Sequence, residues 1–290
     1  MLGLSNGLWG HLGPRRIWDF TRPGVTGLTF SRASTAIARD AGGGLSLFAN
    51  GQPRLTTAGL LLEPAALNKL VIRNAEPLDL TGVSKGGDAA ATLSLVNDAA
   101  AVTGSGLGGV CGSGVVFRLD NSAGSTAAYI NFPTSVAGAT SAHSISIYSR
   151  GGTGVVGTSV STTGLSSGAG LIPASILYRR ATTASGGMPM VAGRYPRIFA
   201  DPGQTLWLIL PQFEAGGAAT STIRTEGAQA ARSAELASVT PPPGASRYTA
   251  VYGSGRTVVS GPVTGGTAFD LVAGRPWIGP GNELQRLEMR

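Results

Sequence analysis

At 290 residues the chain is longer than most single domains, and charged residues make up 13% of it, about half the usual share. Long solvated helices need charge on their outer faces, so this composition excludes a mainly helical protein, and a hydrophobic fraction of 42% excludes a disordered one. The net charge of +7 comes mostly from scattered arginines rather than from a basic run, so nucleic-acid binding is not expected.

Residues 1–75 are predicted to be an irregular, β-rich region that serves attachment or oligomerisation. The first residues have no basic stretch followed by an apolar run, so we expect no signal peptide. Aromatic residues gather in this region, and an aromatic patch on a small fold is typical of a surface that meets a partner. These residues are Trp9, Trp18, Phe20, Phe30 and Phe48.

Residues 76–240 are predicted to fold as a jelly-roll β-sandwich. Four segments alternate between apolar and polar residues with a period of two, and turn residues bound each of them. Their lengths are those of strands in a sandwich. The four segments are residues 92–96, 115–119, 144–148 and 205–210. The predicted fold class is therefore all-β.

The last region, residues 241–290, is predicted to be a small β element joined by a stiff proline spacer at 241–244. Residues 248–259 and 268–277 have the character of strands. A short helix is predicted over 282–290, with Asn282 as its N-cap.

Cysteine, histidine and acidic residues give few options for redox or metal chemistry. Cys111 is the single cysteine, so we expect no internal disulfide and a small buried side chain at this position. The two histidines are too few for a zinc site. Asp98, Asp120 and Asp201 are candidate calcium ligands, with solvated turns as the alternative. We expect no cofactor, and no membrane insertion, since no apolar run approaches about 18 residues.

Three patterns resemble catalytic or cofactor sites, but each lacks a necessary part. Residues 164–168 match the nucleophile elbow of hydrolases, yet no histidine follows Ser166. Residues 104–109 match the spacing of a dinucleotide loop without the helix and acid that it needs. Glu214 with Glu226 or Glu235 would be the carboxylate pair of a glycosidase, and a structural role for Glu214 is the simpler interpretation. We therefore expect a protein that is not an enzyme.

Nine short segments, in order along the chain, resemble segments of phage tail and head-fibre or spike proteins. Those near the N-terminus are residues 18–22 (WDFTR), 28–36 (LTFSRASTA), 52–54 (QPR) and 59–68 (GLLLEPAALN). Those farther along are similar to the carbohydrate-binding-module-like jelly roll of these proteins, also found in phage-like gene transfer agent particles. They are residues 144–152, 177–180, 206–216, 220–225 and 231–235. The chain departs from the family pattern at Leu177, Arg224 and Glu235, where the family has Trp, Pro and Asp.

The resemblance implies a fibre or spike on the surface of a virion or phage-like particle, assembled in the bacterial cytoplasm. Its expected partners are host capsular or surface polysaccharide and, through residues 1–75, other structural proteins of the particle. Fibre subunits are symmetric homo-oligomers, which we expect here too. A purely structural adaptor that binds no glycan is the alternative, and a polysaccharide depolymerase is less favoured.

Glycan binding requires aromatic faces that stack on sugar rings and polar side chains that bond the hydroxyls. The candidate glycan-binding residues are Tyr148, Arg150, Tyr178, Arg179, Trp207 and Gln212. The competing interpretation places Trp207 in the core, with Tyr148 and Tyr178 in packing roles.

Overall fold

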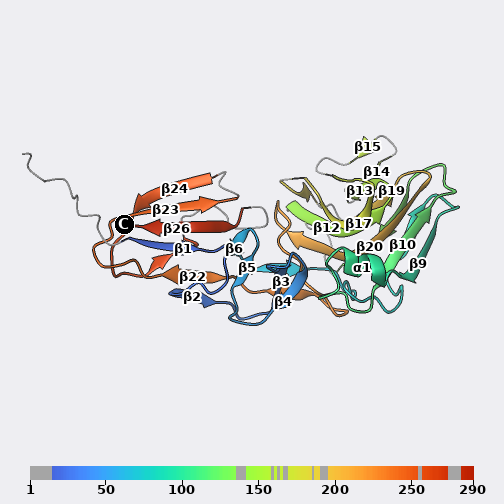
Figure 1. The fold of residues 1–290 in the computed structure, drawn as a ribbon. Coiled ribbons are helices and arrows are strands. Elements are labelled where there is room, and N and C mark those ends of the chain that lie inside the picture. The colour runs from blue at the N-terminus through green and yellow to red at the C-terminus, as the bar shows by residue number, and fades with distance from the viewer. Residues whose placement is uncertain are drawn as a thin grey trace, which may run out of the picture. The chain divides into compact units, whose positions relative to one another are not determined.

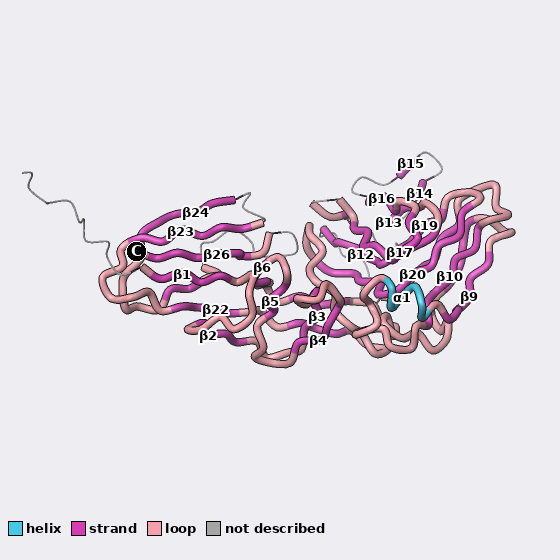
Figure 2. The backbone as a smooth tube through the Cα atoms, in the orientation of Figure 1, coloured by secondary structure: helices cyan, strands magenta, loops and turns pink. Residues whose placement is uncertain are grey.

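The computed structural model of the chain describes residues 15–134, 142–157, 160–161, 164–165, 169–184, 186–189, 195–253, 257–273 and 282–290. These residues form strands joined by turns, with one short helix among them, α1 (Ala99–Gly104), which confirms the predicted all-β class (Figure 2). Contacts divide the chain into two compact units. Unit 1 consists of Met1–Arg32, Gly51–Glu63 and Glu235–Arg290, and unit 2 of Ala33–Asn50 and Pro64–Ala234.

These units do not follow the three consecutive regions that the sequence predicts, 1–75, 76–240 and 241–290. Strand β1 (Arg16–Asp19) pairs with β26 (Leu284–Met289), and β2 (Leu28–Ser31) pairs with β22 (Leu236–Val239), so both ends of the chain contribute to unit 1. The proline segment 241–244 contains a turn between β22 and β23 (Arg247–Tyr252) of this same unit. It therefore does not separate two domains.

Unit 1 contains a six-stranded and a three-stranded antiparallel sheet (Figure 1). Its remaining strands are β5 (Arg54–Thr56), β6 (Gly59–Leu61), β24 (Thr257–Pro262) and β25 (Phe269–Asp270). The larger sheet has the order β24-β23-β26-β6-β5, with β1 also paired to β26, and the smaller has the order β2-β22-β25. Both sheets contribute to one apolar core, for example through Leu287 and Val239.

The N-terminal aromatic residues lie in cores rather than on an exposed patch. Trp18 and Phe20 are 2% and 0% exposed in the core of unit 1, and Phe30 packs against it half-buried. Phe48 of unit 2 is also buried, whereas Trp9 lies outside the described residues. These side chains stabilise the fold, because apolar area removed from water is the main favourable contribution to folding.

The helix predicted over residues 282–290 is wrong, because β26 is a strand between β1 and β23. Leu284 and Leu287 are both buried, and their spacing of three is typical of a helix face. The register between β23 and β26 shifts there, so Gln285 has no partner on β23. This extra residue is a β-bulge, which explains how two core leucines stand three apart on one strand.

Four charged side chains, each 0% exposed, form a buried charge cluster in unit 1. Glu235 accepts hydrogen bonds from Arg32 (Nη1 to Oε1, 2.7 Å) and from Arg54 (Nε to Oε1, 2.8 Å). Arg54 also pairs with Glu63 (Nη1 to Oε2, 2.8 Å), whose backbone N–H donates to Glu235 Oε2 at 2.9 Å. Two cations and two anions balance, as a buried cluster requires.

Unit 2 contains two facing antiparallel sheets. One has six strands, ordered from β17 (Ser175–Thr182) through β12 (Ala142–Gly151), β20 (Gln204–Ala215) and β10 (Val115–Asn121) to β9 (Thr92–Asn97), with β18 (Met188–Pro189) also paired to β12. The other runs from β16 (Gly170–Ile172) through β13 (Gly154–Gly157), β19 (Arg197–Ala200) and β11 (Ala128–Asn131) to β8 (Ser84–Gly87). The four strands predicted from alternation, now β9, β10, β12 and β20, are thus confirmed.

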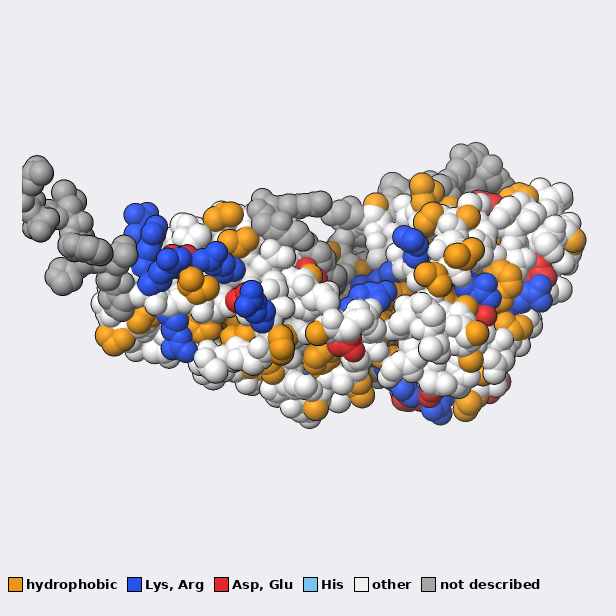
Figure 3. All heavy atoms as spheres, viewed as in Figure 1, with side chains coloured by type: hydrophobic (Ala, Val, Ile, Leu, Met, Phe, Trp, Pro, Cys, Tyr) orange, Lys and Arg blue, Asp and Glu red, His pale blue; other side chains and the backbone are white. Residues whose placement is uncertain are grey.

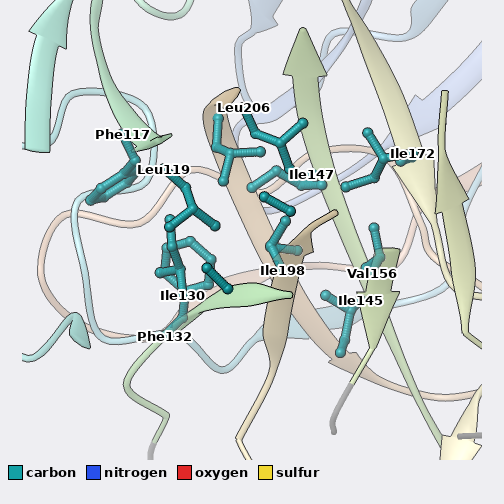
Figure 4. Close-up of a cluster of buried hydrophobic side chains, with 14 of the residues drawn as sticks. Phe117, Leu119, Ile130, Phe132, Ile145, Ile147, Val156, Ile172, Ile198 and Leu206 are labelled. Atoms are coloured by element: carbon teal, nitrogen blue, oxygen red, sulfur yellow. The ribbon is translucent and has the colours of Figure 1, made fainter. Parts of the chain in front are cut away.

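The core between these two sheets follows from the alternation along each strand. Leu119, Ile147 and Leu206 of the first sheet face Ile130 and Ile198 of the second, and all five are fully buried (Figure 4). Residues between them on the same strands point to the other face, since the side-chain period of a strand is two. The six-stranded sheet therefore has an outer face, where five of the six candidates lie; alternation directs Arg179, the neighbour of Tyr178 on β17, to the opposite side.

The outer face of this sheet is partly covered by α1 and by a hairpin of β3 (Ala36–Arg39) and β4 (Leu45–Phe48). Ile37, Leu45 and Val102 from these elements pack with Tyr148 and Ile209 of the sheet. Two further pairs complete the described strands, β7 (Ala66–Asn68) with β21 (Ala230–Arg232) and β14 (Val160–Ser161) with β15 (Gly164–Leu165). In the described part of the chain no helix is long and apolar enough to cross a membrane.

Two buried asparagines, Asn68 and Asn74, fix residues 68–74 of unit 2 to the second half of β20. Asn74 donates from Nδ2 to the carbonyls of Pro211 (3.0 Å) and Ile223 (2.9 Å), and Asn68 donates to the same two oxygens. The backbone oxygen of Asn74 accepts the N–H of Leu210 at 2.9 Å. Leu210 has φ of 55°, at a register shift between β12 and β20, so these contacts hold a backbone conformation that bulky residues rarely adopt.

Asp88 ties the turn after β8 to the start of β11, and this gives a pH prediction. Its carboxylate accepts bonds from Thr126 and from the N–H groups of Ala90 and Ser125, and the Thr126 N–H is the main reason its pKa falls to about 2. A lowered folded pKa means that the ionised form stabilises the fold above the ordinary pKa, and that this contribution is lost as the pH falls toward 2.

We therefore expect Asp88→Asn to unfold at lower urea than the wild type at pH 7. The difference should shrink steadily below about pH 4, where the unfolded carboxyl takes up a proton first. Urea titrations at several pH values measure this. A gap between the two proteins that stays constant down to pH 2.5 would contradict it.

Candidate functional site

Four side chains form a row across the outer face of the six-stranded sheet in unit 2: Arg118 on β10, Trp207 on β20, Arg150 on β12 and Tyr178 on β17. Arg118 and Arg150 are the cross-strand neighbours of Trp207 on its two sides. Their guanidinium carbons lie 5.7 and 4.3 Å from the centre of the indole ring, within cation–π range. Arg150 also lies 5.8 Å from the Tyr178 ring. We call these residues the arginine–aromatic row.

Alternation places Trp207 in this row, because its neighbours Leu206 and Leu208 point into the core. Trp207 is half-buried and packs beside α1, so part of its ring remains accessible. Figure 3 shows arginine or lysine side chains next to hydrophobic ones on the face over β10. Such a surface offers hydrogen-bond donors beside the accessible part of an aromatic ring.

Arg150 is held in place by Asp98, which lies just before α1. Two parallel bonds join them, Nε to Oδ2 at 2.6 Å and Nη2 to Oδ1 at 2.7 Å, and this bond is the main reason the pKa of Arg150 is raised. The Tyr178 hydroxyl donates to the same Asp98 Oδ2 at 2.6 Å. Burial raises the pKa of Tyr178, so its hydroxyl stays neutral. The middle of the row is therefore rigid before any ligand arrives.

At the other end of the row, Arg118 pairs with Asp120 two residues along β10. Asp120 also accepts the hydroxyl of Thr205 at 2.8 Å and the N–H of Ser122 at 3.1 Å, and hydrogen bonds from Ser122 and Thr205 lower its pKa to about 2. The carboxylate therefore remains charged and fixes the Arg118 guanidinium beside the indole.

The other sequence-predicted residues occupy different environments. Tyr148 is 5% exposed and packs under α1, and Gln212 is 0% exposed. The Gln212 amide donates to Glu214 Oε2 at 2.6 Å and accepts the N–H of Ile223 at 2.6 Å, so it serves the fold. Arg179 is exposed at the edge strand β17. The structure thus brings together Arg150, Tyr178 and Trp207 of the six candidates.

Sequence reasoning missed Arg118 and Asp98 as members of this site. Arg118 stands between Phe117 and Leu119 in the predicted strand, so alternation alone puts it on the outer face. What alternation does not give is the pairing of β10 with β20, which sets Arg118 opposite Trp207. Asp98 was considered only as a candidate calcium ligand, with a solvated turn as the alternative, and not as a partner of Arg150.

The carboxylates considered for catalysis are engaged in structural contacts. Glu214 is 1% exposed and accepts hydrogen bonds from Thr220 and Gln212, while burial raises its pKa. Glu226 pairs with Arg73 and Arg224 in unit 2, and Glu235 belongs to the buried charge cluster of unit 1. Each carboxylate is held by its own partners.

The remaining motifs give no site in the described residues. Ser166 lies outside them, and residues 104–109 follow α1 instead of opening a helix. The candidate calcium ligand Asp201 accepts the Thr153 hydroxyl at 2.6 Å, and no group of three His, Cys, Asp or Glu suited to a metal occurs in the described residues. Cys111 is 1% exposed, as predicted, and burial raises its pKa to about 12.

A scan against protein-family models and a search of curated proteins found no match to this chain.

Proposed function

We propose that this chain is a surface fibre or spike protein of a phage or phage-like particle, and that unit 2 binds host cell-surface polysaccharide. The arginine–aromatic row is the observation that carries the proposal. A half-buried indole with a fixed guanidinium group on each side provides donors for ring hydroxyls beside an aromatic surface. Attachment to other particle proteins through residues 1–75 and assembly as a homo-oligomer belong to the same proposal.

The topology of unit 2 supports a jelly-roll module. From β10 to β20 the strands alternate between the two sheets, apart from the separate β14–β15 pair and two places where successive strands stay in one sheet, β13 with β16 and β17 with β18. Their orders, β17-β12-β20-β10 and β16-β13-β19-β11, are those of two interlocked Greek keys. Jelly-roll folds occur in viral capsids and lectins, although a fold by itself does not specify a ligand.

The buried charge cluster supports the resemblance to fibre proteins. Arg32, Arg54, Glu63 and Glu235 come from four of the segments on which that resemblance rests, and the four side chains meet in unit 1. A shared three-dimensional arrangement gives a physical reason for such short segments to recur in order along a chain.

Binding to an array of bacterial capsular polysaccharides tests the function. We expect the wild type to bind at least one polysaccharide, and Trp207→Ala to bind it about ten-fold or more weakly, because stacking contributes on the order of 1–2 kcal/mol. Trp207→Phe keeps an aromatic face and should retain part of the affinity. Tyr195→Ala, an exposed aromatic outside the row, is the matched control and should bind normally.

A thermal melt of each variant separates lost binding from lost folding. If a folded Trp207→Ala protein binds with wild-type affinity, the arginine–aromatic row is not the polysaccharide-binding site. Failure of the wild type to bind any polysaccharide would reject the function.

A further inference from the structure

Next to the arginine–aromatic row, unit 2 has an open pocket of about 540 Å³, which we call the arginine pocket. Arg39 from β3 and Arg179 and Arg180 from β17 contribute its charged side chains. The rest of its lining comes from the C-terminal end of α1, from the turn before β17 and from β17 itself. The remaining lining residues are Gly104, Ser105, Pro173, Leu177 and Tyr178.

Two arginines of this pocket, Arg39 and Arg179, have no acidic partner among the described residues. No Asp or Glu is among its described lining residues. The Arg179 side chain makes no hydrogen bond or ion pair within the described part of the chain, and Arg39 bonds only the backbone oxygen of Gly43 there. Some other arginines of unit 2 have carboxylate partners, as Arg150 has Asp98 and Arg118 has Asp120, whereas Arg197 bonds the neutral amide of Asn131. The pocket therefore concentrates positive charge that a bound anion would offset.

The third arginine of the lining, Arg180, is engaged within the fold. Its Nη2 donates to Ser146 Oγ at 2.9 Å and to the Thr220 carbonyl, and its charge acts on the buried carboxylate of Glu214. Its Nε is buried without a hydrogen-bond partner in the described structure. Asp40 is the acid nearest to Arg39 along the chain. Its carboxylate accepts hydrogen bonds from the Ser46 hydroxyl and from N–H groups of its own turn.

The pocket and the row share one residue. Tyr178 belongs to both, and its hydroxyl shares Asp98 with Arg150. Leu177, 42% exposed, and Pro173 give the pocket an apolar side that suits the C–H face of a sugar. A chain of sugars lying along the row would therefore place a neighbouring residue over the arginines.

We infer that the polysaccharide bound by unit 2 is acidic, and that an oxyanion of one sugar residue, a carboxylate or a phosphate, binds in the arginine pocket. This rests on the proposed function and narrows its ligand class. Guanidinium groups bind both oxyanions through two parallel hydrogen bonds. A neutral polysaccharide would use the row alone and leave the pocket charge unpaired.

The test uses the full chain on an array that carries each capsular polysaccharide twice, as isolated and after chemical reduction of its uronic acids to neutral sugars. We expect binding to an acidic polysaccharide that falls at least ten-fold for the Arg39→Ala/Arg179→Ala double variant and weakens with added salt. If a carboxylate is the anion, reduction of the polysaccharide abolishes this difference. If a phosphate is the anion, binding survives reduction, occurs on phosphate-containing polymers and remains sensitive to the double variant.

The double variant Arg22→Ala/Arg247→Ala is the matched control, because it removes the same charge from exposed positions of unit 1 and should bind like the wild type. Binding of neutral polysaccharides that depends on Trp207 but not on Arg39 and Arg179 would overturn this inference and leave the proposed function standing. Equal loss in both double variants would show a general charge effect and also overturn it. Binding to no polysaccharide would reject both.

Discussion

Arg54→Ala is expected to lower the free energy of unfolding of unit 1 by about 3–5 kcal/mol, the usual cost of removing one partner from a buried ion pair. Arg54 bonds both Glu63 and Glu235, and all three side chains are 0% exposed. Without the guanidinium, Glu63 has lost its pairing with Arg54 and Glu235 retains only Arg32 among its cations. A loss of this size is a large share of the stability of a typical domain.

The pH dependence of this variant has a definite sign. Carboxylates left without their cation in a buried site have a raised folded pKa, so the folded protein binds more protons than the unfolded chain. The variant should therefore recover part of its stability as the pH falls from 8 to 5. Urea unfolding followed by tryptophan fluorescence measures it, since Trp18 lies in the core of this unit.

Arg22→Ala is the control for this experiment. Arg22 pairs with Asp19 on the surface, with side chains 81% and 41% exposed, and such pairs contribute no more than about 1 kcal/mol. If Arg54→Ala and Arg22→Ala lower stability equally, the cluster does not hold unit 1 together as its burial indicates.

In unit 2, Asn74→Asp is expected to lower the free energy of unfolding by about 3 kcal/mol or more at pH 7. The substitution keeps the shape of the side chain but replaces an N–H₂ group that donates to the Pro211 and Ile223 carbonyls with a charged oxygen. A buried charge facing two carbonyl oxygens is strongly unfavourable. Protonation restores one donor, so the loss should be smaller at pH 5 than at pH 7.

Asn97→Asp makes the same chemical change at an exposed position. The oxygen of Asn97 accepts the N–H of Ala99 at 3.1 Å, and an aspartate keeps this bond, so we expect a change within about 0.5 kcal/mol. Urea titrations of both variants at pH 7 and pH 5 make the comparison. If the two variants are equally stable at pH 7, the hydrogen bonds that the Asn74 amide donates do not stabilise unit 2 as expected.

The candidate site was partly predictable, because the alternation of side chains along a strand shows from the local sequence which residues share a face. Trp207 and Arg150 stand at alternating positions in segments read correctly as β20 and β12, so their presence on one face follows from a period of two. Gln212 follows the same alternation, yet its amide is buried, where it donates to the Glu214 carboxylate and accepts the N–H of Ile223. Burial of a polar residue depends on which other segment covers it, and that segment is distant in sequence.

The arginine pocket shows the same limit. Arg39 and Arg179 are far apart along the chain and meet only because the β3–β4 hairpin packs near β17 in unit 2. No spacing in the sequence links them. The scatter of arginines along the chain argued against nucleic-acid binding, and the fold brings Arg39 to the same pocket as Arg179 and Arg180.

The sequence by itself determined the fold class of this protein. Scarce charge, abundant glycine and period-two alternation gave an all-β chain, and they located β9, β10, β12 and β20. Tertiary structure decided the rest. It paired β1 with β26 and β2 with β22, so that unit 1 is built from both ends of the chain, and it brought Arg32, Arg54, Glu63 and Glu235 into one cluster.

Leu284 and Leu287 have a spacing that is typical of a helix, but in the tertiary structure they lie on a bulged strand. The physical reason is that alternation fixes only the two faces of a strand. Partner, register and bulge are chosen by how those faces pack against distant residues.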